Sequence, residues 1–115
     1  MIFSWDEANV EHIGTHGVTP TEAEHVVRHA EPPYPRSIGD DRFIVWGRTE
    51  AGRLLQVVFV RPDDEDVDVE SLGAADLVAF SEGTDEVVRV IHAMELEGRK
   101  KKQARRGDRR RGRKR

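Results

Sequence analysis

Histidine and arginine are the residues of this 115-residue chain that could do chemistry without a cofactor. Metal-independent cleavage of RNA needs a group that activates the 2′-hydroxyl, cations that stabilise the charged phosphorane, and a group that protonates the leaving oxygen. His92 is the one histidine on an expected core strand, and imidazole suits either proton-transfer role. The expected strands also carry Arg48, Arg53 and Arg89, whose guanidinium groups can clamp phosphate. These four residues could converge on one sheet face; the alternative is that each arginine is an ordinary solvent-facing residue.

The other four histidines form two pairs at helical spacing. His12 and His16 are four residues apart, as are His25 and His29, so each pair could chelate a transition metal. Neither segment is His-Glu-x-x-His, and no third acidic ligand is evident. His16 also precedes Gly17, where an imidazole can cap free helix carbonyls. We therefore predict neither a metal site nor a cofactor.

Basic residues near the end of the chain could bind RNA. Gly98–Arg115 holds twelve Lys and Arg and a single Asp, which gives strong phosphate affinity without base preference. The RNA-binding residues expected in a last helix are Arg99, Lys100, Lys101, Lys102, Arg105 and Arg106. Trp5 and Trp46 could stack on bases, but a tryptophan in a strand is more often part of the core, which we predict for both.

The helices that must position these residues have clear boundaries. Asp6 is a typical N-cap for a helix from about Glu7 to His16, which Gly17 would end. Thr19-Pro20-Thr21-Glu22 is a capping box that predicts a second helix. The apolar stripe of this helix is Ala23, Val26, Val27 and Ala30, and the prolines from Pro32 onward end it.

The strands are predicted by alternation and β-branched residues. Phe3–Trp5 can form a short strand, and Arg42–Arg48 and Arg53–Val60 form a hairpin. Val87–Ala93 is a further strand, and a basic helix from about Glu95 to Arg106 follows. The order predicts an α+β fold: an antiparallel sheet with two N-terminal helices on one face and a C-terminal basic helix.

Charge divides the chain into three blocks. Pro62–Glu86 holds ten acidic residues and no basic one, and we treat it as an irregular acidic insert in which Asp66–Glu70 could be a strand and Leu72–Phe80 a short helix. We expect one domain over residues 1–106, with Gly107–Arg115 as a basic disordered tail that the insert could attract in competition with RNA. The chain has no cysteine and no long apolar run, and Met1–Asp6 does not have the pattern of a signal peptide, so we expect a cytoplasmic protein without a membrane partner.

Three segments taken in order resemble the BrnT-type toxins, which are RelE-like proteins. The first is Trp5-Asp6, Asn9, His12-Ile13, His16-Gly17-Val18 and Glu22; the second is Val45–Thr49 with Gly52–Val58; the third is Val88–Ala93 followed by a basic helix. The resemblance implies a RelE-like fold, ribonuclease activity that inhibits translation by cleaving mRNA or ribosome-associated RNA, and a co-encoded antitoxin as partner. It supports a catalytic set of Arg48, Arg53, Arg89 and His92.

The chain also departs from the pattern of this family. Thr15, Met94 and Gln103 stand where members often carry a basic or aromatic residue, and the acidic insert lengthens a loop that is normally short. Two alternatives therefore stay open: a non-catalytic RNA- or ribosome-binding module of the same fold, and an interaction protein that uses its acidic insert.

Overall fold

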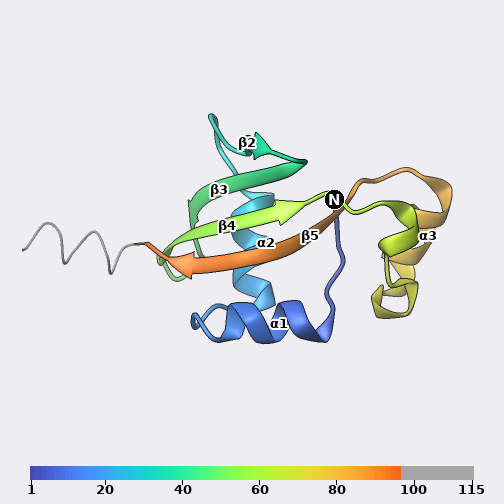
Figure 1. Ribbon diagram of the computed structural model, residues 1–115, viewed down its shortest axis with the longest axis horizontal. Helices are drawn as coiled ribbons and strands as arrows, with labels where there is room; N and C mark the ends of the chain where they lie inside the picture. The colour runs from blue at the N-terminus through green and yellow to red at the C-terminus, as the bar shows by residue number, and fades with distance from the viewer. Residues whose placement is uncertain (97–115) are drawn as a thin grey trace, which may run out of the picture.

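Residues 1–96, which the computed structural model describes, form five strands and three α-helices (Figure 1). The strands are β1 (Ile2–Phe3), β2 (Arg36–Gly39), β3 (Arg42–Arg48), β4 (Leu54–Val60) and β5 (Val87–Glu95), and the helices are α1 (Glu7–Gly14), α2 (Pro20–Arg28) and α3 (Ala74–Glu82). The predicted α+β class is confirmed. None of these helices is long and apolar enough to cross a membrane.

The five strands form one sheet in the order β1-β5-β4-β3-β2. Strands β3, β4 and β5 pair antiparallel, as predicted, and β2 adds an antiparallel pair with β3 that was not predicted. Strand β1 runs parallel to β5 through the pairs Ile2–Val87 and Phe3–Val88. The sheet is therefore mixed, and the predicted antiparallel sheet did not include the parallel pair of β1 and β5. A parallel pair needs a long crossover between its strands. Here α1, α2 and the other three strands all lie between β1 and β5 in the chain.

Strand β2 is one that the residue pattern does not reveal. All four of its residues are exposed, so no alternation of apolar and polar side chains marks it. Its turn to β3 contains Asp40 and Asp41, both in the left-handed conformation at φ 50° and 57°. A two-residue turn of this kind matches the twist of the paired strands, and aspartate tolerates positive φ better than most residues. Gly39-Asp40-Asp41 is thus the signal that indicates the hairpin.

The predicted caps fix where α1 and α2 begin. The Asp6 carboxylate accepts a hydrogen bond from the Asn9 backbone N–H at 2.7 Å. At α2, the Glu22 N–H donates to Thr19 Oγ1 at 3.2 Å, while the Thr19 N–H donates to the Glu22 carboxylate at 3.1 Å. Each cap satisfies backbone groups that the helix itself leaves unpaired.

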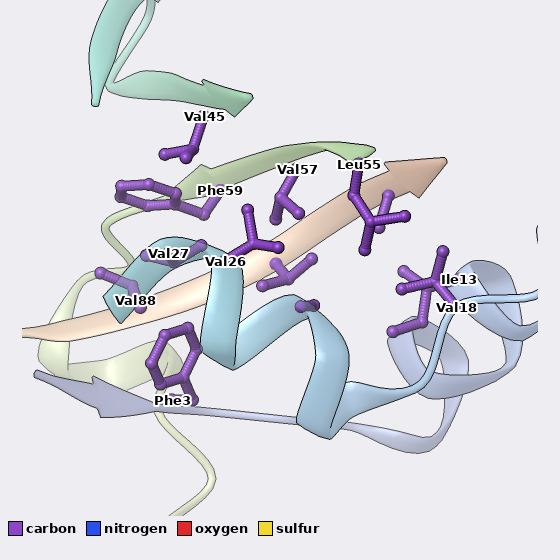
Figure 2. Close-up of a cluster of buried hydrophobic side chains, with 13 residues drawn as sticks. Phe3, Ile13, Val18, Val26, Val27, Val45, Leu55, Val57, Phe59 and Val88 are labelled. Carbon is purple, nitrogen blue, oxygen red and sulfur yellow. The ribbon is translucent and has the colours of Figure 1, made fainter. Parts of the chain in front are cut away.

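Helices α1 and α2 cover one face of the sheet, and the core lies between them and the strands (Figures 1 and 2). Helix α2 lies against β3 and β4, and α1 against β5. Gly47 permits a close approach, because a Cβ there would lie only 3.2 Å from Val26 Cγ1. The buried cluster consists of Phe3, Ile13, Val18, Ala23, Val26, Val27, Val45, Leu55, Val57, Phe59, Val88, Val90 and Ala93.

The acidic insert folds into two 3₁₀ turns, Asp64–Asp66 and Val69–Ser71, followed by α3 beyond one end of the sheet (Figure 1). The possible strand at Asp66–Glu70 was wrong, because the Asp68 carboxylate accepts from the Glu70 N–H and closes a turn there. The short helix lies two residues later than expected. Helix α3 buries none of its residues, so it adds little to the core.

The predicted C-terminal basic helix and the tail lie outside the described residues, apart from Glu95 and Leu96. Glu95 is the last residue of β5 and not the start of a helix. The six expected RNA-binding residues from Arg99 to Arg106 therefore have no structural placement here.

Candidate functional site

Three histidines from two distant parts of the chain meet at one edge of the sheet. His12 lies on α1, His16 follows the end of that helix, and His92 lies on β5. Their ring centroids are 5.3 to 5.9 Å apart, and one ring nitrogen from each lies within 4.8 Å of the others. His12 and His16 are exposed, and His92 is half-buried. We call these three residues the histidine cluster; among residues 1–96 it is the one such group with metal-ligand chemistry.

The turn after α1 holds His16 in place. The Val18 N–H donates to the Ile13 carbonyl and the Gly17 N–H to the Gly14 carbonyl, which is the Schellman arrangement. Gly17 supplies the left-handed residue at φ 71°, as the sequence predicted, and the buried Ile13 and Val18 complete the motif. The direction of the chain beyond His16 is thus set by both hydrogen bonds and burial.

A local irregularity of β5 accompanies His92. Phe59 pairs with Val90 but Val58 pairs with His92, so Ile91 is an extra residue in β5. Such a bulge bends a strand and redirects the next side chain. Strand β1 pairs with β5 only at Val87 and Val88, so α1 and not another strand lies beside the remaining length. The histidine cluster lies at the edge of β5 that β1 leaves unpaired.

The electrostatics of the cluster disfavour full protonation. Partial burial lowers the pKa of His92, and the charges that His16 and His12 can carry lower this pKa further. Three imidazoles this close therefore include at least one that is readily neutral. Neutral imidazole can accept a proton or bind a metal ion.

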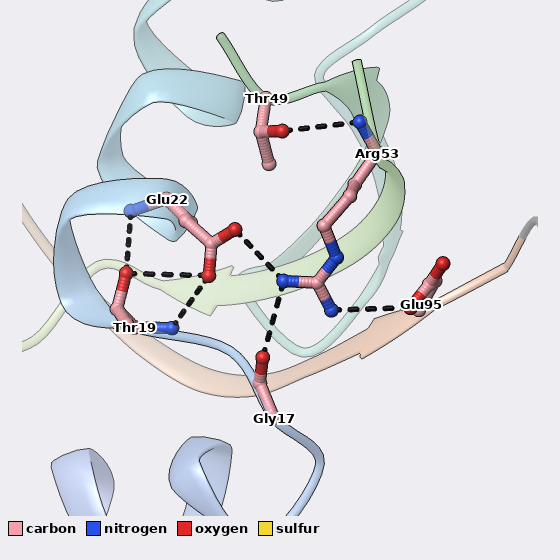
Figure 3. A network of polar contacts seen from close by, with 6 residues as sticks. All are labelled: Gly17, Thr19, Glu22, Thr49, Arg53 and Glu95. Atoms are coloured by element: carbon pink, nitrogen blue, oxygen red, sulfur yellow. Dashed lines mark hydrogen bonds and ion pairs between the residues drawn. The ribbon is translucent and has the colours of Figure 1, made fainter. Parts of the chain in front are cut away.

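Arg53 lies on the helix side of the sheet and forms a network of ion pairs (Figure 3). Its Nη1 donates to the Glu22 carboxylate at 2.8 Å and to the Gly17 carbonyl at 3.2 Å, and its Nη2 donates to the Glu95 carboxylate at 3.1 Å. The hydrogen bonds that Arg53 donates to Glu95 and Glu22 raise the pKa of Arg53. Burial opposes ionisation of Glu22, but the Thr19 N–H and Arg53 outweigh it and lower its pKa. Arg53 thus joins α2, β4 and β5.

Arg48 and Arg89 lie on the other face, at opposite ends. Arg48 pairs with Leu54, whereas Arg89 lies in the row of Val60 and Arg42. Arg42 and Arg48 are six residues apart on β3, which corresponds to about 20 Å. The backbone of Arg89 lies about 7 Å from that of His92 along the sheet, whereas Arg53 Nη1 contacts the carbonyl of Gly17, the residue after His16. Arg89 Nη2 donates to the Asp66 carbonyl, and Arg89 Nε is buried without a partner among the described residues.

The outer face of the sheet, which α1 and α2 leave uncovered, carries Trp46. Trp46 is 38% exposed, so it is not part of the core, whereas Trp5 packs against the core as predicted. Trp46 stacks with Tyr34 at a centroid distance of 6.3 Å and donates to Gln56. A pocket of about 370 Å³ is lined by His29, Glu31, Trp46, Gly47 and Arg48.

The sequence did not reveal that His12 and His16 belong with His92. Their spacing indicated only a pair on one helix, and joining them to His92 requires the packing of α1 against β5.

No protein-family model, curated protein or solved structure matches this chain.

Proposed function

We propose that this protein is the toxin of a type II toxin–antitoxin pair and acts as a metal-independent endoribonuclease. The observation that carries the enzymatic part is the histidine cluster, because it offers two or more imidazoles at a site that solvent can reach. One imidazole can accept a proton while another donates one, and this is the pair of roles that RNA cleavage requires.

The proposed reaction uses the 2′-hydroxyl of the RNA as the nucleophile. One imidazole of the cluster removes its proton, the 2′-oxygen bonds to phosphorus, and the bond to the 5′-oxygen breaks. A protonated imidazole gives its proton to that oxygen, so the products are a 2′,3′-cyclic phosphate and a 5′-hydroxyl. Arg89, on the same strand as His92, would stabilise the charge on the phosphorane.

The outer face supplies features that suit a single strand of RNA. The exposed Trp46 with Tyr34 could stack on a base, and Arg48 beside them could contact a phosphate. Trp46 lies two strands from His92 and is offset by two residues, because Trp46 pairs with Gln56 whereas His92 pairs with Val58; their backbones are therefore about 12 Å apart. A short RNA segment can span this distance. Arg99 and the basic residues after it would add phosphate affinity that does not depend on sequence.

The toxin role and the antitoxin partner rest on the resemblance to BrnT-type toxins. The test is expression of the chain in a bacterial host, alone and together with the small gene beside its own. We expect growth arrest from the chain alone and rescue by the neighbour. Growth arrest that persists with every neighbouring gene would contradict the pairing with a co-encoded antitoxin.

Cleavage itself is tested with purified protein and RNA in an excess of chelator. His92→Ala should lower the rate by roughly 100-fold, the usual size of a general acid or base contribution. His25→Ala is the matched control, because His25 lies on α2 outside the cluster. This variant should cleave RNA at the same rate as the parent. Equal activity of His92→Ala and the parent would exclude the assignment.

A second candidate is a non-catalytic RNA- or ribosome-binding module. The observation that favours it is that Arg53 donates hydrogen bonds to the carboxylates of Glu22 and Glu95. Arg53 was expected to bind the RNA phosphate, and these bonds occupy its guanidinium group. This candidate predicts RNA binding without cleavage under every condition, and Trp46→Ala should then weaken binding without any change in RNA length.

A further inference from the structure

We propose that His12, His16 and His92 form a binding site for a divalent transition-metal ion of the zinc class. The three side chains come from α1, the turn after it and β5, and one nitrogen from each already lies within 4.8 Å of the others. In a tetrahedral zinc site, nitrogens about 2.0 to 2.1 Å from the metal lie roughly 3.3 Å from each other. A contraction of about 1.5 Å would therefore complete the site.

To bind a metal ion, the side chains of His12 and His16 must move toward His92, and both can do so. His12 and His16 are exposed, so small rotations of their rings meet little resistance. The backbone that carries them is fixed by the helix and by the hydrogen bonds of Gly17 and Val18. His92 is half-buried on a strand and gives the site a rigid third ligand. Two adjustable ligands and one fixed ligand are a suitable set for capturing an ion.

The donor set defines the class of metal. Three imidazole nitrogens favour Zn²⁺, Co²⁺, Ni²⁺ and Cu²⁺, whereas Mg²⁺ and Ca²⁺ prefer oxygen ligands. The chain has no cysteine, so a thiolate cannot complete a closed structural site. Three protein ligands leave a fourth position for water or for an oxygen of a bound molecule.

Metal binding would have a consequence for cleavage, and this consequence rests on the proposed function. A bound ion occupies the nitrogen lone pairs that proton transfer requires, so zinc should suppress the cleavage seen in chelator. The metal site does not depend on cleavage activity, and the experiment below measures metal binding in the absence of RNA.

A pair of histidines at helical spacing binds metals weakly by itself, so the contribution of His92 is the decisive feature. The chain contains its own control, the pair His25 and His29 on α2, whose rings stack at 4.1 Å. A variant that lacks this second pair keeps the cluster, although it loses more histidines than a variant that lacks His16 or His92 alone.

The experiment is a titration of the untagged full chain with Co²⁺, followed by visible absorbance and by displacement with Zn²⁺. We expect one equivalent to bind to the parent and to the His25→Ala/His29→Ala control with the same affinity. His92→Ala and His16→Ala should each weaken binding by at least about tenfold. His16 is exposed beyond the helix end, so its variant keeps the test valid if His92→Ala unfolds. Equal binding by parent and His16→Ala, an equal loss in the control, or no binding below millimolar Co²⁺ would overturn the site.

Discussion

At the scale of single residues, Arg53 shows how one side chain can hold three elements together. It donates to the carboxylates of Glu22 and Glu95 and to the carbonyl of Gly17, and its side chain is 30% exposed. Charge-assisted hydrogen bonds of this kind contribute more than exposed surface ion pairs do. Arg53 therefore has a structural role that is separate from any contact with RNA.

Removing Arg53 should accordingly destabilise the protein. We expect Arg53→Ala to lower the free energy of unfolding by about 1 to 2 kcal/mol, because two carboxylates lose their partner at a partly exposed site. Arg36→Ala, on the exposed strand β2, is the control and should change the stability by less than about 0.5 kcal/mol. Urea denaturation of both variants measures the difference, and equal stability of the two would contradict the role of the network.

The same network predicts a dependence on pH through Glu22. The pKa of Glu22 is lowered from its ordinary 4.5, so the folded state holds the ionised form more strongly than the unfolded state does. This stabilisation is present above pH 4.5 and is lost as pH falls through the lower, folded pKa. Glu22→Gln should therefore be less stable than the parent at pH 7, and the difference should shrink in acid. A difference that stays constant down to pH 3 would contradict this prediction.

At the scale of elements, the sequence predicted α1, α2, β3, β4 and β5 because each carries a local signal. Caps mark the helices, and alternation marks the strands. Strand β2 was not predicted, because all its residues are exposed. The parallel pairing of β1 with β5 was not predicted either, because pairing partners depend on tertiary contacts. His92 was identified from its strand, but its meeting with His12 and His16 depends on how α1 packs.

The contact between α2 and β3 can be tested by a pair of substitutions. Val26 is 1% exposed, so Val26→Ala should cost about 2 kcal/mol, more than the roughly 1 kcal/mol expected for loss of the Thr19 cap. Gly47→Ala places a methyl group 3.2 Å from Val26 Cγ1 and should cost about 1 kcal/mol. In the Val26→Ala background this methyl group has room. A double-mutant cycle should show the cost of Gly47→Ala falling toward zero, and additive costs would show that the close approach is wrong.

At the scale of the whole molecule, opposite charges are segregated along the chain. Pro62–Glu86 carries ten acidic residues, and Gly98–Arg115 carries twelve basic ones. The structure adds that Asp63, Asp64 and Glu65 are exposed, so the charges of the insert can act on a basic segment or on RNA. Long-range attraction of this kind is weak and strongly screened by salt.

Competition between the insert and RNA for the basic tail makes a distinct prediction. Deleting residues 107–115 should weaken RNA binding and flatten its salt dependence. Neutralising Asp63, Asp64 and Glu65 to the matching amides should tighten RNA binding at low salt in the full chain, but less in the truncated chain. Equal tightening in both backgrounds, measured at two salt concentrations, would show that the insert repels RNA without involving the tail.

The central claim is that His12, His16 and His92 act as one site on RNA, and the kinetics of a double variant test it most directly. Rates of RNA cleavage in chelator are measured for the parent, His16→Ala, His92→Ala and the double variant. We predict a loss of roughly 100-fold for His92→Ala and a double variant little slower than the slower single variant, because residues that act as a unit are not additive. Full activity of His92→Ala, or losses that simply multiply in the double variant, would contradict the claim.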